Sequence, residues 1–269
     1  MTPKQRMITA LERGIPDRVP TFELEFQLAP ELIGKDFCVD RDFEGLTGKA
    51  LDDKILENAK VLVEAYTLLE HDAICIQLKP ELVARTVEAI HRIAGDTFLL
   101  MAHGDGTFAI RTGTGCTSSP TAWWTSRSPS RRRPRACATR PSRETTGCCA
   151  RGSTASSCAA TTASTRGFLS PRCLRSSFSL PCAHHRRHPR RGRYAIKHTD
   201  GNIMPILDQL VAANPHALHS LDPMAGVDIR KVKELVGDKV ALCGNVHCAA
   251  MQTGTEQDVV DSATYCMTW

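Results

Sequence analysis

The middle of this 269-residue chain lacks most of the residues from which strands and mixed-charge surfaces are built. Residues 111–193 contain no Lys, Asp, Asn, Gln, Ile, Val, Met or Tyr. They contain 17 Arg against a single acid, Glu144, and seven of the twelve Cys. The segment therefore carries a net charge of +16, and the other residues carry −11 within the overall +5. Without Ile or Val it cannot supply ordinary buried strands, and no apolar period of 2 or 3.6 residues runs through it.

Two interpretations of this arginine-rich segment differ in what they imply about partners. It could be a disordered, basic insert that binds nucleic acid. We favour a frameshift, because Arg, Ser, Thr, Pro, Ala and Cys are what GC-rich DNA encodes when it is read out of frame. On that hypothesis there is no nucleic-acid partner, and clustered cysteines such as Cys148 and Cys149 form neither a disulfide framework nor a zinc site.

The same composition divides the chain into three parts. Residues 1–110 and 194–269 read as two pieces of one fold, and residues 111–193 as an out-of-frame or disordered segment. A sheet that lost its middle strands would have unpaired edges. We therefore expect the 269-residue chain to be poorly folded and inactive.

Three further absences narrow the class of protein. The amino terminus has no apolar signal region, and no apolar run is long enough to cross a membrane. The five cysteines outside the arginine-rich segment suit a reducing compartment. No Gly-x-Gly-x-x-Gly follows the first expected strand, so a dinucleotide-binding fold has no support. We expect a cytoplasmic protein without a membrane partner.

Outside the middle segment, short apolar stretches alternate with amphipathic ones. The spacing predicts strands over residues 21–26, 72–76, 97–101, 194–197, 217–221 and 240–244. A polar loop follows each strand and leads into a predicted helix. Such a βα repeat forms either an open doubly wound sheet or a closed (β/α)₈ barrel.

The strand predicted at 194–197 leads directly into two polar side chains. His198 and Asp200 are two residues apart, so on extended backbone both point the same way. Gly201 allows a turn there, and Asn202 can cap the helix that follows. Because α/β barrels carry their chemistry at the carboxyl ends of strands, His198 and Asp200 are our first catalytic candidates. The alternative is a pair that only satisfies local hydrogen bonds.

The stretch around Glu23 alternates strictly between apolar and acidic residues. Phe22, Leu24 and Phe26 would face one side of a strand, and Glu23 and Glu25 the other. On a barrel strand one face packs under helices and the other looks inward, so the two acids would face the interior. The alternative is an edge strand with a solvated face.

Several phrases, taken in order, resemble the uroporphyrinogen decarboxylase superfamily, which also includes cobalamin-linked methyltransferases. The likeness covers about residues 1–110 and 194–269, and the order of the phrases is more specific than any one of them. It implies an α/β fold, a (β/α)₈ TIM barrel that is incomplete here, with its active site at the strand carboxyl ends. The phrases are Pro16–Pro20, Phe22–Glu25, Lys197–Asn202, Leu221–Ala225, Asp228–Lys233 and Gly244–Cys248.

The branches of this superfamily differ in the charge that follows the first strand. The decarboxylase acts on a substrate covered in carboxylates, and its family pattern has an Arg-x-x-Gly-Arg loop there. This chain has Glu23 and Glu25 instead, which would repel a polyanion. The resemblance therefore favours methyl transfer from an ether or amine to a corrinoid protein. The alternative is a uroporphyrinogen decarboxylase of porphyrin biosynthesis, which would need no cofactor.

The resemblance also implies roles for individual residues. In the zinc methyltransferases a His-x-Cys pair at this strand holds the metal, so His198 and Asp200 would be the zinc ligands, with Asp200 where the family has Cys. In the corrinoid-linked type, the leaving group must be protonated or bound to a Lewis acid. Glu23, His198, Asp200 and Asn245 are the candidates for that catalytic role.

The remaining polar residues near predicted strand ends are candidates for binding the small-molecule substrate. They are Glu25, Asp105, Asn202 and Asp222. Asp222 could instead cap the helix that follows it. His219 lies within its predicted strand and is expected to be a core residue.

Overall fold

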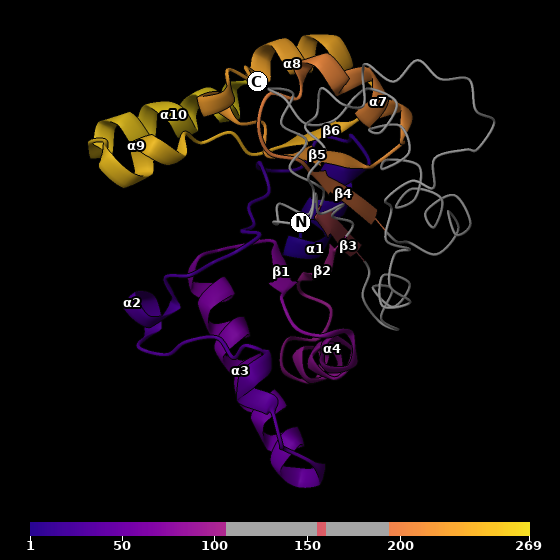
Figure 1. The fold of residues 1–269 in the computed structure, drawn as a ribbon, viewed down its shortest axis with the longest axis vertical. Coiled ribbons are helices and arrows are strands. Elements are labelled where there is room, and N and C mark those ends of the chain that lie inside the picture. Colours follow the sequence, from indigo (N-terminus) through magenta and orange to yellow (C-terminus); the bar gives the residue numbers. More distant parts are fainter. Residues whose placement is uncertain (106–154, 160–193) are drawn as a thin grey trace, which may run out of the picture.

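A computed structural model describes residues 1–105, 155–159 and 194–269 of the chain as an α/β structure (Figure 1). The strands are β1 (Ala73–Ile76), β2 (Leu99–Asp105), β3 (Ala155–Ala159), β4 (Tyr194–His198), β5 (Ala217–His219) and β6 (Ala241–Cys243). The α-helices are α1 (Pro3–Leu11), α2 (Ala29–Ile33), α3 (Gly48–Leu68), α4 (Pro80–Ala94), α7 (Leu207–Ala212), α8 (Ile229–Val236), α9 (Cys248–Thr253) and α10 (Glu256–Thr268). Short 3-10 helices are η1 (Asp40–Phe43), η3 (Met204–Ile206) and η4 (Pro223–Ala225). Within these ranges, none of the helices combines the length and apolar character needed to cross a bilayer.

The six strands form one parallel sheet in which each strand lies beside its neighbour in the chain. In a doubly wound sheet the order reverses at a switch point, whereas here it runs unbroken from β1 to β6. The predicted βα repeat is therefore confirmed, with the sequential order that a barrel requires. Among the described strands the sheet ends at β1 and β6, so a closed barrel is not shown.

Strand β3 lies within residues 111–193, where we expected no ordinary strand. Its backbone pairs with β2, where Asp105 is opposite Ala159, and with β4, where Ala159 is opposite His198. The edges of β2 and β4, which we expected to be unpaired, are both occupied. That removes the physical reason for expecting a poorly folded chain, and we now expect the sheet to unfold as one unit. The rest of the predicted middle segment lies outside the described residues.

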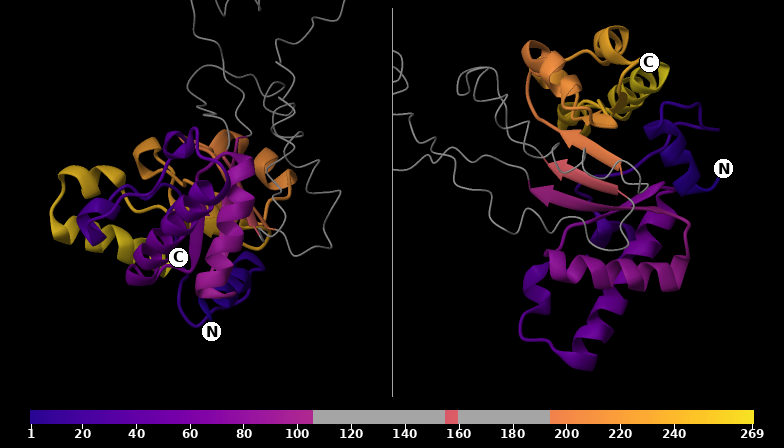
Figure 2. Two further views of the ribbon diagram at one scale, coloured as in Figure 1. Left: turned by 90° about the horizontal axis from the view of Figure 1, so that it is seen from below. Right: turned by 90° about the vertical axis from the view of Figure 1, so that its right-hand side faces the viewer.

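Helices cover the two ends of the sheet's outer face (Figure 2). Ile74 and Leu100 pack against α3 and α4 in one apolar cluster, and Leu218 packs against α7 and α8 in another. The next residue of each strand points the other way, so Cys75 and Met101 lie on the opposite face and form a third cluster. We call this opposite side the inner face.

Helix α1 closes the inner face at the amino ends of the strands. Thr2 caps it and exchanges hydrogen bonds with Gln5, the predicted capping box. Its apolar side places Met7 and Leu11 in the inner-face cluster. Tyr194 at the start of β4 donates a hydrogen bond to Glu12 just beyond the helix, with 2.5 Å between the oxygens. The carboxyl ends of the strands lie away from α1.

The predicted strand at 21–26 is wrong, although the segment does follow the free edge of β1. One backbone hydrogen bond joins them, from Asp72 to the carbonyl of Thr21. The other contacts use side chains: the Thr21 amide donates to the Asp72 carboxylate, and Gln77 donates to the carbonyl of Leu24. Because side chains take the place of backbone partners, no ladder forms.

Candidate active site at the carboxyl ends of β4 and β5

The last residue of β4 is His198, and its ring forms one half of the candidate site. Alternation from Ile196, which is in the inner-face cluster, places His198 on the same face. Its Nε2 lies 3.3 Å from Oδ1 of Asp200, whose side chain is 54% exposed. Gly201 then has φ +80, which lets the chain turn toward η3. The structure therefore brings His198 and Asp200 together, as the spacing predicted.

The neighbouring strand supplies a second histidine that we had assigned to the core. His219 is opposite His198 in the parallel register, and their Nδ1 atoms lie 2.7 Å apart. Ser220 follows it and donates a hydrogen bond from Oγ to Oδ1 of Asp200, over 2.8 Å. The ring of Phe22 packs on His219 with 5.6 Å between ring centroids. The predicted strand extended to residue 221, which placed His219 in its interior, whereas β5 ends at His219.

These contacts set the charges of the site. The hydrogen bond from His198 lowers the pKa of Asp200 to about 2, with help from Ser220 and against the effect of burial. Burial lowers the pKa of His219 to about 4, the charge of His198 acts in the same direction, and Asp200 opposes it. Near neutral pH, Asp200 is therefore an anion and His219 is uncharged.

Glu23 and Glu25 do not face the site in the way we expected. The alternation is confirmed only in part: both acids are exposed and Phe22 and Leu24 pack against the inner-face cluster, but Phe26 packs against the α3–α4 cluster instead. The acids therefore turn away from the interior. Glu23 keeps contact with solvent, yet surrounding protein raises its pKa, and its charge acts on Tyr66 of α3. It is not among the groups that shift the pKa of Asp200 or His219.

Asp222 and Asn245 hold loops together beyond β5 and β6. Asp222 caps η4 by accepting a hydrogen bond from the Met224 amide over 2.8 Å, the alternative role that we had left open. The side-chain amide of Asn245 donates to the carbonyls of Leu221 and Val227. With its donors used in this way, Asn245 ties the loop after β6 to the loops around η4.

The other two substrate-binding candidates lie at strand ends near β4. The Asn202 side chain accepts a hydrogen bond from the Met204 amide over 3.0 Å, so it stabilises the start of η3. Asp105 is the last residue of β2, and its backbone is two strands from His198 in the sheet register. Its side chain lies outside the described residues.

A zinc ion at His198 and Asp200 would need more protein ligands than the described residues provide. Nε2 of His198 and Oδ1 of Asp200 are 3.3 Å apart. Two ligand atoms of one tetrahedral ion with bonds of about 2 Å are separated by about the same distance. Among residues 1–102 and 194–269, whose side chains the structure describes, however, no group of three His, Cys, Asp or Glu is arranged to hold a metal ion. The described residues therefore do not fit a zinc centre, and zinc at His198 and Asp200 stays a prediction.

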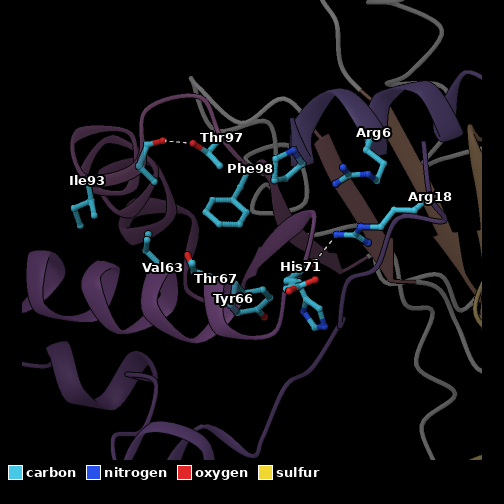
Figure 3. A pocket seen from close by; sticks show the side chains of 12 residues that line it. Arg6, Arg18, Val63, Tyr66, Thr67, His71, Ile93, Thr97 and Phe98 are labelled. Atoms are coloured by element: carbon cyan, nitrogen blue, oxygen red, sulfur yellow. Dashed lines mark hydrogen bonds between the residues drawn. The ribbon is translucent and has the colours of Figure 1, made fainter. Parts of the chain in front are cut away.

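A pocket of about 500 Å³ lies at the other end of the sheet (Figure 3). Arg6 and Arg18 line one side of it, and Tyr66 and Phe98 the other. Both arginines contact the carboxylate of Asp72 just before β1, so their charges are already compensated. The pocket is thus formed around a structural ion pair, away from His198.

Comparison with known protein families gives one match. A family model described as uroporphyrinogen decarboxylase (URO-D) matches residues 148–268. The matched range contains β3 to β6 and the His198–His219 pair, and it begins inside the arginine-rich segment. No curated protein matches the chain. The match confirms the resemblance over residues 194–268 and does not extend to residues 1–110, while the frameshift stays a hypothesis.

Proposed function

Because residues 148–268 match the uroporphyrinogen decarboxylase family, whose members are generally enzymes, we propose that the chain transfers a methyl group from a small ether or amine to a corrinoid carried by a partner protein. The observation that carries the proposal is the His198–Asp200 pair at the exposed carboxyl end of β4. We leave Asn245 and Glu23 out of it, because Asn245 donates to the carbonyls of Leu221 and Val227, and Glu23 is not among the groups that shift the pKa of Asp200.

The His198–Asp200 pair can supply the proton that the leaving group of this reaction needs. When the bond between the methyl carbon and its oxygen or nitrogen breaks, the electron pair stays on that heteroatom, which must be protonated to leave easily. Nε2 of His198 points toward the solvent-exposed Asp200, so a proton there is accessible to a ligand. The ionised Asp200 carboxylate, 3.3 Å away, fixes the direction in which this Nε2–H points.

The open position of the site fits a cofactor that arrives on another protein. A reduced corrinoid would supply the electron pair that the methyl carbon accepts. Asp200 is more than half exposed, and Ser220 beside it is partly exposed. The described residues leave this edge accessible, as docking of a partner would require.

Charge weighs against a polycarboxylate substrate, although the matching family model carries the decarboxylase name. In residues 1–105 and 194–269, no arginine hydrogen-bonds or pairs with His198, Asp200 or His219. Arg6 and Arg18 are bound to Asp72 at the other end of the sheet. A polyanion would meet the ionised Asp200, and like charges that close destabilise binding.

The test is an assay of the purified chain with methoxyarenes and methylamines as donors and reduced corrinoid as acceptor, followed by the change in corrinoid absorbance. Replacement of His198 by Gln should lower turnover by about 10²–10⁴-fold, the usual effect of removing a proton donor. His91→Gln, at the exposed end of α4, is the control and should keep full turnover. Release of CO₂ from uroporphyrinogen, with no methyl transfer from any donor, would replace this proposal by the decarboxylase alternative.

A further inference from the structure

The contact between Nδ1 of His198 and Nδ1 of His219 can hold only one proton. The two Nδ1 atoms are 2.7 Å apart, which is hydrogen-bond distance and too close for two protonated nitrogens. One ring must therefore donate and the other accept. His219 completes a hydrogen bond with His198 in either case.

The other nitrogen of His198 is fixed by its neighbour. Nε2 faces the Asp200 carboxylate, an acceptor, so Nε2 carries a proton. When His198 is neutral its Nδ1 is bare, and His219 must donate from its own Nδ1. The contact with His219 therefore selects the tautomer of His198 that presents Nε2–H to the open edge.

Two contacts of His219 and one of its neighbour Ser220 hold the His219 ring where it can hydrogen-bond to His198. Its carbonyl accepts a hydrogen bond from the Thr199 amide over 3.3 Å, which links the ends of β4 and β5. Phe22 covers one side of its ring. Ser220 next to it has φ +66, a conformation that residues other than glycine rarely adopt, and this directs its hydroxyl to Asp200.

We propose that His219 is a positioning residue, which orients the His198 ring so that its Nε2–H faces Asp200 and the ligand. The role of that proton in methyl transfer rests on the function proposed above, but the orientation does not. His219 acts through His198 and needs no contact with the substrate.

Nuclear magnetic resonance of the protein labelled with ¹⁵N at histidine tests the orientation without any substrate. Loss of a signal in His198→Gln identifies the His198 ring among the ten histidines. At pH 8 we expect a protonated Nε2 and a bare Nδ1 on His198, and a protonated Nδ1 on His219. A His198 ring protonated at Nδ1 alone in the wild-type chain would overturn the proposal, and this reading needs no variant to fold.

Two substitutions separate positioning from packing. His219→Phe keeps a ring against Phe22 but cannot hydrogen-bond, so we expect a mixture of His198 tautomers. In His219→Asn, the side-chain amide can donate from a position close to that of Nδ1, so the single tautomer should return. Equal His198 spectra in the Phe variant and the wild type, or no recovery with Asn, would refute the role.

Kinetics then connect the ring to the reaction. With methyl transfer established, His219→Phe should lower kcat at least tenfold with KM changed less than twofold, and His219→Asn should recover most of kcat. Unchanged kcat in the Phe variant would show that the orientation has no role in turnover. Absence of methyl transfer in the wild type would count against the proposed function alone, since the tautomer measurement stands apart from it.

Discussion

Replacing Asp72 by Ala would test how the amino-terminal segment is held against the sheet. The Asp72 side chain is fully buried just before β1. Its carboxylate accepts a hydrogen bond from Arg6 of α1 over 2.5 Å and one from the Thr21 amide over 2.8 Å. Arg18 lies 3.1 Å from Oδ2, the oxygen that also accepts from Thr21. The substitution removes one anion that helix α1 and the segment of residues 18–21 share.

The expected loss follows from burial. Removing one partner of a buried ion pair destabilises a protein by about 3–5 kcal/mol, because the other charge is left without compensation. Arg6 keeps a second partner in Asp17, at 2.5 Å, so we expect the lower end, about 3 kcal/mol of unfolding free energy. Urea titration followed by far-ultraviolet circular dichroism measures it.

Asp96→Ala is the matched control. Asp96 also pairs with α1, through Lys4, but its side chain is 69% exposed. An exposed pair contributes about 0–1 kcal/mol, so this variant should unfold close to the wild type. If the two substitutions destabilised the chain equally, or Asp72→Ala changed the unfolding free energy by less than about 1 kcal/mol, the reasoning about this buried cluster would be wrong.

Three other predictions follow from the same structure. Burial lowers the pKa of His219 from 6.5 to about 4, so the neutral ring contributes its full stabilisation above about pH 6.5 and loses it as the pH falls toward 4. The unfolding free energy should therefore fall by about 2 kcal/mol between pH 7.5 and 5, and urea titration should show a smaller fall for His219→Asn. Gly244 has φ +85 with open space where a side chain would begin, so Gly244→Ala should lower the unfolding free energy by about 1–2 kcal/mol and Gly244→Asn by less, and equal values would contradict the backbone argument. Resequencing of the coding DNA should find an insertion or deletion near each end of residues 111–193, and a clean sequence that reproduces the segment would end the frameshift hypothesis.

The sequence predicted those features that depend on neighbours along the chain. The capping box at Thr2 and the pairing of His198 with Asp200 both follow from spacings of two or three residues. Five of the six predicted strands are present, because a short apolar run between polar turns defines a buried strand locally.

The features that sequence reasoning missed depend on distant partners. Alternation around Glu23 correctly placed Phe22 and Leu24 together but not Phe26, and whether a ladder forms was decided by the Asp72 and Gln77 side chains of another segment. His219 became part of the site through its register with β4, which no local pattern reveals. Strand β3 has no β-branched residue in its sequence, so propensity could not find it, and its two neighbours define it through backbone pairing.

The packing of Phe22 on His219 couples the evolution of two distant positions. The ring comes from the edge of β1, whereas the histidine lies four strands further along the sheet. A smaller side chain at position 22 would open the histidine to water, and a larger one would displace it. Among relatives, substitutions at these two positions should therefore occur together, with gains of volume at one matched by reductions at the other.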